Sequence, residues 1–406
     1  MKSVLRQPWR NVANLGLESV HNHDSQTSPR IARYTVRRHF LGIIWAPPQE
    51  DASGVNRGCG TSLTSWSTGV VFYVRLYNPK SMGISDHIAL HNDFTVDDTF
   101  LPLCVGSQPV GVVSRPIAEL LGRDLPGLFD FHDTRIAYLE PFGPARRRLG
   151  RLAGLLGTEY GITPPPRGEE LTVYPLGLLN EGIPPERVLD GQLSAAGVCN
   201  VDRNATSPLG IVTFGVMLVA YVRGVDNSIR LLLGRRSRSK PAHQFPGKLD
   251  PLAAGAIPTL SGLKATLCAE ALEEAGLPYH YSMTATLKSH VSYLMRQHSG
   301  VKNQVLFVYD LELPPYYSRD WRPHSLDGSV EDFVLMSANE AAHRLQHTQD
   351  FKGGSDLVLI DFLIRHGHIR PGIYGPYSLP GALRRRIRAR RSSAGTLDLQ
   401  IVHSAG

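Results

Sequence analysis

Three glutamates in the second half of the chain have types and spacing that could carry out chemistry. Glu270, Glu273 and Glu274 stand at positions i, i+3 and i+4, so a helix would present them on one face. Three like charges this close repel one another, and they are tolerated where water screens them or where cations bind between them. Carboxylate oxygens are the ligands that Mg²⁺ prefers, and Mg²⁺ also binds phosphate oxygens. The spacing therefore fits either a metal site for phosphate chemistry or a solvated acidic helix face.

The residues around these glutamates predict the elements that position them. Residues 211–237 contain two apolar runs separated by the turn signal Asp-Asn-Ser, which predicts a strand and its returning partner. A Gly- and Pro-rich loop follows, and then a helix over 263–275, two strands within 289–313 and a closing helix over 356–367. Strands around one central helix with a second helix at the end describe an α/β/α layered domain, which we expect over 211–372.

The remaining residues divide into three parts. Residues 1–90 have weak periodicity, and their first 46 are rich in Arg and poor in acids, as in a mitochondrial presequence or a disordered extension. Both interpretations stay open. Residues 91–210 predict a smaller α/β domain, in which 100–113 form a strand pair around a Gln-Pro turn and a helix follows. Residues 373–406 hold six arginines between 384 and 391, which predicts a solvated basic tail.

The composition limits the class of protein. With 406 residues, 42% hydrophobic and 19% charged, the chain is long enough for two globular domains, each with its own core. Its longest apolar run, 212–222, is too short to span a membrane. The four cysteines form neither a disulfide framework nor a zinc motif, which favours a reducing compartment. The net charge of +7 comes without a nucleic-acid recognition motif, so we expect neither a nucleic acid nor a membrane as partner.

The spacing of the glutamates resembles the Nudix box. That motif reads Gly, five residues, Glu, seven residues, Arg-Glu, an apolar residue, any residue, Glu-Glu, any residue, Gly and an apolar residue. Six positions of this chain fit it: Gly255, Glu270, Glu273, Glu274, Gly276 and Leu277. Two positions depart, because Ser261 stands where the first Glu belongs and Ala269 where the Arg belongs.

The flanking segments resemble the thiamine pyrophosphokinase-related Nudix proteins of fungi and plants. Residues 231–255 carry an arginine-rich turn and the motif Pro-Gly-Lys-Leu-Asp before the box, and the likeness extends over 93–372. It implies a Nudix α/β/α sandwich preceded by a smaller α/β companion domain. It also implies hydrolysis of a diphosphate linkage, with thiamine diphosphate or its oxidised analogues as the small-molecule substrate and the monophosphate as product.

The resemblance and the chemistry of diphosphate hydrolysis give roles to individual residues. Glu270, Glu273 and Glu274 would bind Mg²⁺ or Mn²⁺, and Glu270 and Glu274 would be the catalytic pair. Either Glu270 or a carboxylate of the segment 327–332 would take the proton from the attacking water. The candidates there are Asp327, Glu331 and Asp332.

Several cations precede the box. Arg235, Arg236, Arg238 and Lys240 would hold phosphate oxygens, unless their loop is simply a solvated turn. Lys248 and Asp250 match the Pro-Gly-Lys-Leu-Asp motif, and we expect them to shape the floor of the pocket. Among these cations we expect Arg235, Arg236 and Lys248 to bind the phosphates.

Two functions stay open. The first is a Nudix hydrolase that uses metal-assisted water attack, and the second is a catalytically degenerate Nudix-fold protein that only binds its ligand. The substitutions at Ser261 and Ala269 favour the second, and metal-dependent release of a monophosphate would favour the first. We expect a cytoplasmic location, or a mitochondrial one if the Arg-rich N-terminus is a presequence.

Overall fold

The computed structural model describes the chain from residue 60 onward, with gaps. Residues 60–65 and 71–76 are described by their backbone, and the other ranges are 83–139, 152–166, 168–179, 197–239, 244–259, 261–374, 377–391 and 396–403. Contacts divide the chain into Met1–Gly58 and Cys59–Gly406, and every described residue belongs to the second unit. The Arg-rich residues 1–46 and Lys240 lie outside the described residues.

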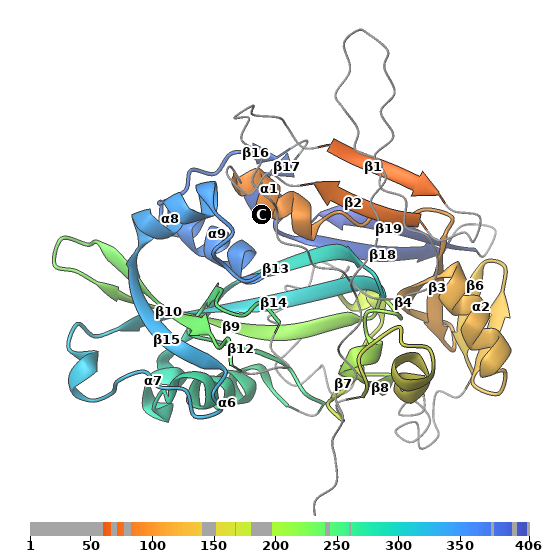
Figure 1. Ribbon diagram of the computed structural model, residues 1–406, viewed down its shortest axis with the longest axis horizontal. Coiled ribbons are helices and arrows are strands. Elements are labelled where there is room, and N and C mark those ends of the chain that lie inside the picture. Colours follow the sequence, from red (N-terminus) through yellow and green to blue (C-terminus); the bar gives the residue numbers. More distant parts are fainter. Residues whose placement is uncertain are drawn as a thin grey trace, which may run out of the picture. The chain divides into compact units, whose positions relative to one another are not determined.

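A seven-stranded sheet carries the residues on either side of the three glutamates (Figure 1). Its main path has the order β11-β10-β9-β14-β13, with β12 beside β9 and β15 beside β10. The strands are β9 (Val212–Arg223), β10 (Ile229–Arg236), β11 (Leu249–Asp250), β12 (Ala253–Ala256), β13 (Thr286–Gln297), β14 (Gly300–Leu313) and β15 (Val330–Ser337). β9 and β14 pair in parallel and the other neighbours are antiparallel. β9 and β14 therefore form the buried centre of the sheet.

Helices cover both faces of this sheet. They are α1 (Ile84–His91), α6 (Leu263–Ala275), α7 (Tyr279–Thr284), α8 (Ala338–His347), α9 (Ser355–Arg365) and α10 (Leu379–Ala382). Along β9 the side chains alternate, so that Val216 and Leu218 join the core under α6, whereas Met217 and Val219 join the core under α8 and α9. Figure 1 shows α6 and α7 on one side of the sheet and α8, α9 and α1 on the other. The expected α/β/α layering is confirmed.

The ends of α6 follow from local sequence. The helix begins after Gly262 and ends at Gly276, whose φ of 60° is the left-handed conformation that glycine adopts without steric cost. A Cβ at Gly276 would also lie 2.5 Å from the ring of His324, so both the backbone conformation and the limited space require glycine here. The apolar residues of α6 pack on the sheet, and this orientation points Glu270 and Glu274 at β12.

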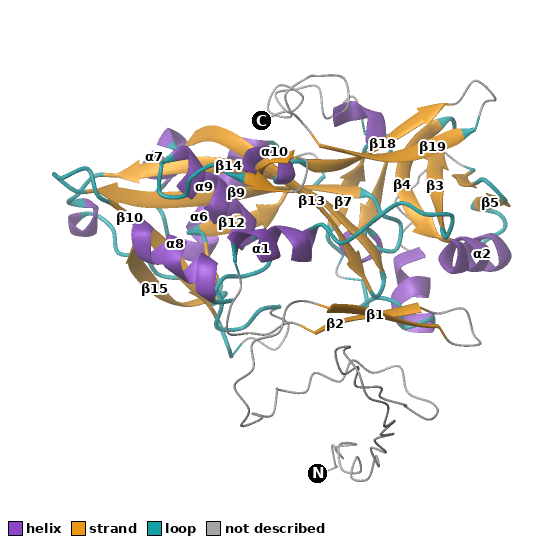
Figure 2. Ribbon diagram, turned by 90° about the horizontal axis from the view of Figure 1, so that it is seen from above, coloured by secondary structure: helices purple, strands orange, loops and turns teal. Residues whose placement is uncertain are grey.

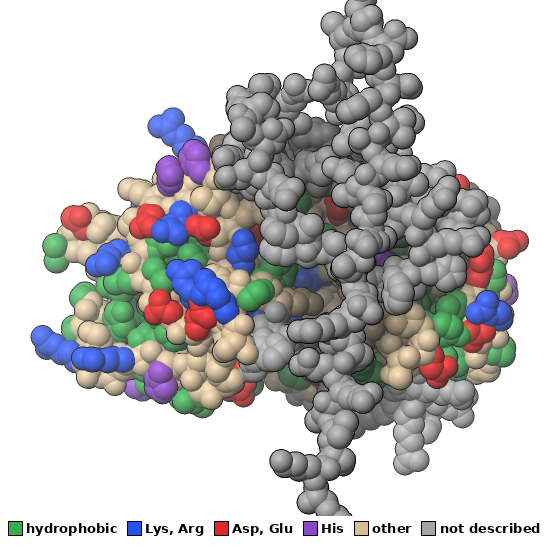
Figure 3. Space-filling view, in the orientation of Figure 1, with side chains coloured by type: hydrophobic (Ala, Val, Ile, Leu, Met, Phe, Trp, Pro, Cys, Tyr) green, Lys and Arg blue, Asp and Glu red, His purple; other side chains and the backbone are tan. Residues whose placement is uncertain are grey.

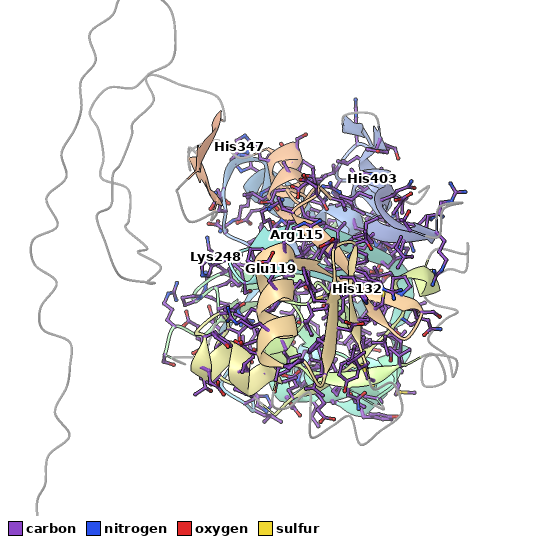
Figure 4. All side chains as sticks on the ribbon, turned by 90° about the vertical axis from the view of Figure 1, so that its right-hand side faces the viewer. Arg115, Glu119, His132, Lys248, His347 and His403 are labelled. Atoms are coloured by element: carbon purple, nitrogen blue, oxygen red, sulfur yellow. The ribbon has the colours of Figure 1, made fainter. Side chains whose placement is uncertain are left out.

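A smaller four-stranded sheet with the order β4-β3-β6-β5 forms the second α/β part. Its elements are β3 (Phe100–Val105), β4 (Gln108–Ser114), α2 (Arg115–Asp124), β5 (Phe129–His132) and β6 (Arg135–Tyr138). Figure 2 shows α2 against this sheet, and Figure 4 labels Arg115 and Glu119 on the helix. The turn of the predicted strand pair is Gly106-Ser107 rather than Gln-Pro, because Gly106 takes the positive φ of 57° that the turn needs.

The remaining elements join or flank the two parts. They are β1 (Gly60–Ser65), β2 (Val71–Leu76), the π-helical turn η1 (Leu155–Glu159), β7 (Glu170–Val173), the 3₁₀ turn η2 (Leu176–Leu179), β8 (Cys199–Asp202), the 3₁₀ turn η3 (Arg203–Ala205), the 3₁₀ turn η4 (Tyr317–Arg319), β16 (Ile373–Tyr374) and β17 (Tyr377–Ser378). None of the helices in the described part of the chain is long and apolar enough to cross a membrane.

Two expected boundaries are wrong. The segment 1–90 was expected to be an extension, but α1 begins at Ile84 and buries Ile88 completely in the core under α8 and α9. The segment 373–406 was expected to be a solvated tail, but β18 (Arg385–Arg391) and β19 (Leu397–His403) pair as a hairpin. Ile387 is buried because every second residue of β18 faces the protein, while Arg385 donates to the carbonyls of Asn92 and Phe94.

Candidate active site

A pocket with a volume of about 420 Å³ lies where the central sheet meets the segments that contain β7 and η3. β12, β13 and β14 contribute wall residues, as do the segment 203–207 and the loop 352–355. Glu270 and Glu274 reach it from α6 past β12. Residues from distant parts of the sequence therefore converge here, as is typical of small-molecule sites.

The backbone of β12 positions both carboxylates. The amide of Ala254 donates a 2.8 Å hydrogen bond to Oε2 of Glu274. Glu270 lies so close to Gly255 that a Cβ there would be 1.9 Å from its Oε1. Gly255 is thus required for close approach of the helix to the strand. The third glutamate, Glu273, is solvent-exposed and does not line the pocket.

Burial makes both pocket carboxylates difficult to ionise. The pKa of Glu270 is raised to about 7, first by burial and then by the charge of Glu273. The pKa of Glu274 is raised to about 8, first by burial and then by Asp250, although Lys352 and the Ala254 amide act in the opposite direction. A bound cation would favour the ionised forms of both groups.

A divalent cation fits this donor set. Glu270 and Glu274 offer carboxylate oxygens, the hard ligands that Mg²⁺ and Mn²⁺ take, and the charge of Glu270 raises the pKa of Glu274. Within the described part of the chain, however, no three His, Cys, Asp or Glu side chains stand together as a ready-made metal site. The expected trio of Glu270, Glu273 and Glu274 is therefore brought together only as a pair.

Of the cations that the sequence proposed for phosphate, Arg236 alone among Arg235, Arg236 and Lys248 lines the pocket. Its Nη1 lies 3.1 Å from Oδ2 of Asp250, and its Nε donates to the carbonyl of Gln244 at 2.9 Å. Arg235 donates instead to the carbonyl of Gly247 at 3.2 Å, and Lys248 donates to that of Gln349. These two side chains therefore bind backbone carbonyls and do not line the pocket.

The remaining expected residues also lie partly inside and partly outside the pocket. Arg238 pairs with Glu331, and Oδ1 of Asp332 accepts from the amide of Phe333. Asp327 is the one of the three candidate acids that lines the pocket, and its Oδ1 accepts from the hydroxyl of Ser325 and the amide of Ser329, both at 2.9 Å.

Asp250, expected to shape the pocket floor, is buried beneath it. Its carboxylate accepts from Lys352 at 2.7 Å, from Arg236 at 3.1 Å and from the hydroxyl of Ser355. Burial alone would raise the pKa of Asp250, but Lys352 and Arg236 lower it on balance. One carboxylate thus ties β10, β11 and the loop before α9 together. On the exposed face that Figure 3 draws, Lys and Arg side chains also lie beside Asp and Glu side chains.

α1 supports the pocket loop from behind. Nδ1 of His87 lies 2.8 Å from Oδ2 of Asp356, and Nε2 of His91 lies 3.7 Å from Oδ1 of the same carboxylate. Burial alone would raise the pKa of Asp356, but His91 and His87 lower it on balance. Asp356 follows directly after the pocket residues Gly353, Gly354 and Ser355. A helix outside the expected domain therefore helps to fix the pocket wall.

Sequence reasoning missed several residues of the pocket. Arg203, Tyr293, Lys302, Gln304 and Lys352 all line it. One signal was available: Lys302 and Gln304 alternate in register with the buried Leu306 and Val308 of β14, so two polar side chains continue an apolar strand face. Such polar residues on a core-facing register are candidates for a site.

The two departures from the Nudix box are visible in the structure. Ser261 lies before α6, where its hydroxyl is 2.9 Å from that of Thr266. Ala269 is exposed on α6 beside Glu270. Neither Ser261 nor Ala269 carries a charge that the fold would have to pair.

Comparisons with known proteins give relatives over most of the chain. No protein-family model matches it. It is 32% identical over 299 residues to "Nudix hydrolase 20, chloroplastic" of Arabidopsis thaliana, covering 71% of this chain and 73% of that protein. It is 31% identical over 290 residues to "Nudix hydrolase 24, chloroplastic" of the same plant, covering 70% and 73%. The NUDIX domain of Shewanella oneidensis NrtR complexed with ADP ribose is 18% identical, with a TM-score of 0.28 over 38% of this chain and 87% of that one. A score that low adds nothing to the two plant relatives.

Proposed function

Since the chain belongs to the Nudix hydrolase family, whose members act on diphosphate linkages, we propose that its pocket performs this hydrolysis with Glu270 and Glu274 as the reacting carboxylates. The observation that carries the proposal is the convergence of these two buried carboxylates against β12, with Arg236 and Lys352 lining the same pocket. Carboxylates and cations in one cavity are what the hydrolysis of a charged phosphate linkage needs.

Glu270 and Glu274 would hold a divalent cation, Mg²⁺ or Mn²⁺. When bound, such a cation neutralises phosphate charge and lowers the pKa of the attacking water. Glu274 is held in place by the Ala254 amide, so we assign it the fixed ligand role. Glu270 lines the same pocket, and we assign it the role of taking the proton from the attacking water. Asp327 is the second candidate for that proton.

The substrate we propose is thiamine diphosphate or one of its oxidised analogues, cleaved to the monophosphate. The support is the resemblance of the flanking segments to the thiamine pyrophosphokinase-related Nudix proteins. The pocket volume of about 420 Å³ falls in the range of small-molecule sites, roughly 300–1,000 Å³. Arg236 and Lys352 would face the phosphates and leave room for the organic part.

The second candidate function is ligand binding without catalysis. Ser261 and Ala269 favour it, because the box Glu and Arg that they replace support the catalytic carboxylates in related proteins. Both functions predict a folded protein that binds diphosphates, so they differ only in turnover.

A panel of diphosphates assayed with Mg²⁺ and with Mn²⁺ tests the proposal. We expect metal-dependent release of a monophosphate, fastest with thiamine diphosphate or an oxidised analogue, and none after chelation. The paired variants Glu274→Gln and Glu331→Gln provide the control, since Glu331 is occupied by Arg238 and does not line the pocket. Absence of turnover with every diphosphate, in a protein that binds them, would leave the binding function.

A further inference from the structure

Four cations line the pocket: Arg203, Arg236, Lys302 and Lys352. Three of them have carboxylate partners. Nη1 of Arg203 lies 2.9 Å from Glu169, and both Arg236 and Lys352 share Asp250 at 3.1 and 2.7 Å. Their charges are therefore largely compensated by the protein itself.

Lys302 differs from the other three. Within the part of the chain that the structure describes, its ammonium makes no hydrogen bond or ion pair, and the ring of Tyr293 lies 5.5 Å from its Nζ. The side chain lies on β14 in register with Gln304, and both residues line the pocket. Lys302 is thus a cation that the fold aims into the cavity without supplying an anion.

The surroundings make this arrangement costly. The pKa of Lys302 is lowered to about 8, first by burial and then by the charge of Arg203, although Asp356 acts in the opposite direction. An ammonium that is partly removed from water without a paired counter-anion destabilises the folded protein. An anion that enters the pocket would remove this cost, so the free energy of binding should depend on Lys302.

We propose that Lys302 binds a phosphate oxygen of the diphosphate substrate, on the pocket wall formed by β14. The proposal rests on the function proposed above in one respect, because it takes the ligand to be a diphosphate. A lysine serves this purpose as a point charge on a flexible stem, which tolerates small shifts of the phosphate. Glu270 and Glu274 approach from α6, so the substrate would lie between the metal-binding carboxylates and Lys302.

The test uses the full chain and methylenediphosphonate, a diphosphate analogue that cannot be hydrolysed. Isothermal titration calorimetry in the presence of Mg²⁺ should show that Lys302→Gln weakens binding about tenfold or more, since one charge-assisted contact is lost. Lys302→Arg keeps the charge and should bind within about threefold of the unmodified protein. Lys288→Gln is the matched control, because Lys288 is exposed on the neighbouring strand β13 and does not line the pocket.

A second measurement uses the unmodified protein and does not depend on the folding of a variant. Reductive methylation followed by peptide mass spectrometry should show that methylenediphosphonate protects Lys302 and leaves Lys288 reactive. Equal labelling of Lys302 with and without the probe, or undiminished binding by folded Lys302→Gln, overturns the proposal.

The kinetic outcome separates this inference from the proposed function. If diphosphates are hydrolysed, Lys302→Gln should raise KM more than it lowers kcat, because a binding contact is lost. If no diphosphate is hydrolysed and yet binding depends on Lys302, the proposed hydrolysis fails and the assignment of Lys302 stands. If hydrolysis proceeds and Lys302→Gln leaves both binding and KM unchanged, the assignment fails alone.

Discussion

Gly255→Ala is a single-methyl change that should separate catalysis from folding. A Cβ at this position would lie 1.9 Å from Oε1, 2.1 Å from Cδ and 2.4 Å from Cγ of Glu270. Non-bonded carbon atoms settle near 3.5 Å, so the carboxylate must move away by about 1.5 Å. Gly255 does not have a positive φ, so alanine is compatible with the strand backbone.

The expected effects on stability and rate differ in size. The end of the Glu270 side chain is flexible, and a forced change of its rotamer costs roughly 0.5–1.5 kcal/mol. In a protein of this length that corresponds to a Tm lower by only about 1–2 °C. Catalysis is more sensitive, because a displacement of about 1 Å in a reacting group costs on the order of a hundredfold in rate. We therefore expect a folded protein with kcat reduced about a hundredfold.

The assay is metal-dependent diphosphate turnover together with thermal unfolding of the same preparations. Gly262→Ala is the control, since it adds the same methyl group just before α6, where no neighbouring atom lies within 4 Å of the added Cβ. It should keep most of its activity. If Gly255→Ala were as active as the control, within threefold, Glu270 could not be a reacting group in the place where the structure puts it.

Three further predictions concern the metal, pH and the extent of the folding unit. Mg²⁺ should raise the Tm of the unmodified protein by several degrees and that of Glu274→Gln hardly at all, because the amide lacks the charge that binds the cation. Equal Tm shifts of the two proteins in differential scanning fluorimetry would show that Glu274 does not bind the metal. The pKa of His290 is lowered to about 3, first by burial and then by Arg384 and Arg386, so the unfolded chain binds a proton that the folded one does not. The contribution of His290 to stability should therefore be complete above pH 6.5 and fall by roughly 1 kcal/mol per pH unit below it, and urea titrations of His290→Gln should show a shallower fall. A fragment of residues 211–372 should unfold at much lower urea concentration than one of residues 83–403. The shorter fragment lacks the buried Ile88, Leu379 and Leu383, and its Asp356 lacks the partners His87 and His91. Equal urea midpoints would show that these contacts are dispensable.

The elements that could be predicted are those whose own residues show an apolar run or a helical period. The apolar run of β9 and the periodicity of α6 lie within the elements themselves, and the helix was expected over 263–275, where it is found. α1 could not be assigned, because only Ile84 and Ile88 of its eight residues join the core under α8 and α9, which is too few to form a visible helical period. β18 could not be assigned either, because its many arginines are typical of a solvated tail and only one buried residue, Ile387, indicates the alternation of a strand.

The same distinction applies to the site. Glu270 and Glu274 could be found because one motif on one helix holds both, and the structure brings both into the pocket. Arg235 and Arg236 are neighbours in sequence, and only the strand register of β10 decides which of the two faces the cavity. Lys302 and Lys352 reach the pocket from β14 and from the loop before α9. Their convergence depends on sheet pairing, which no local pattern contains.

The ion pairs under the pocket also limit how the sequence can evolve. Asp250 is shared by Arg236 and Lys352, and all three side chains are largely removed from water. Loss of Asp250 would leave two cations without their partner, and loss of either cation would leave the buried carboxylate undercompensated, at a cost of roughly 3–5 kcal/mol. Single substitutions at these positions should therefore be selected against, whereas joint replacements can be nearly neutral. Across relatives of this protein the three positions should change together, although 102 residues separate Asp250 from Lys352 along the chain.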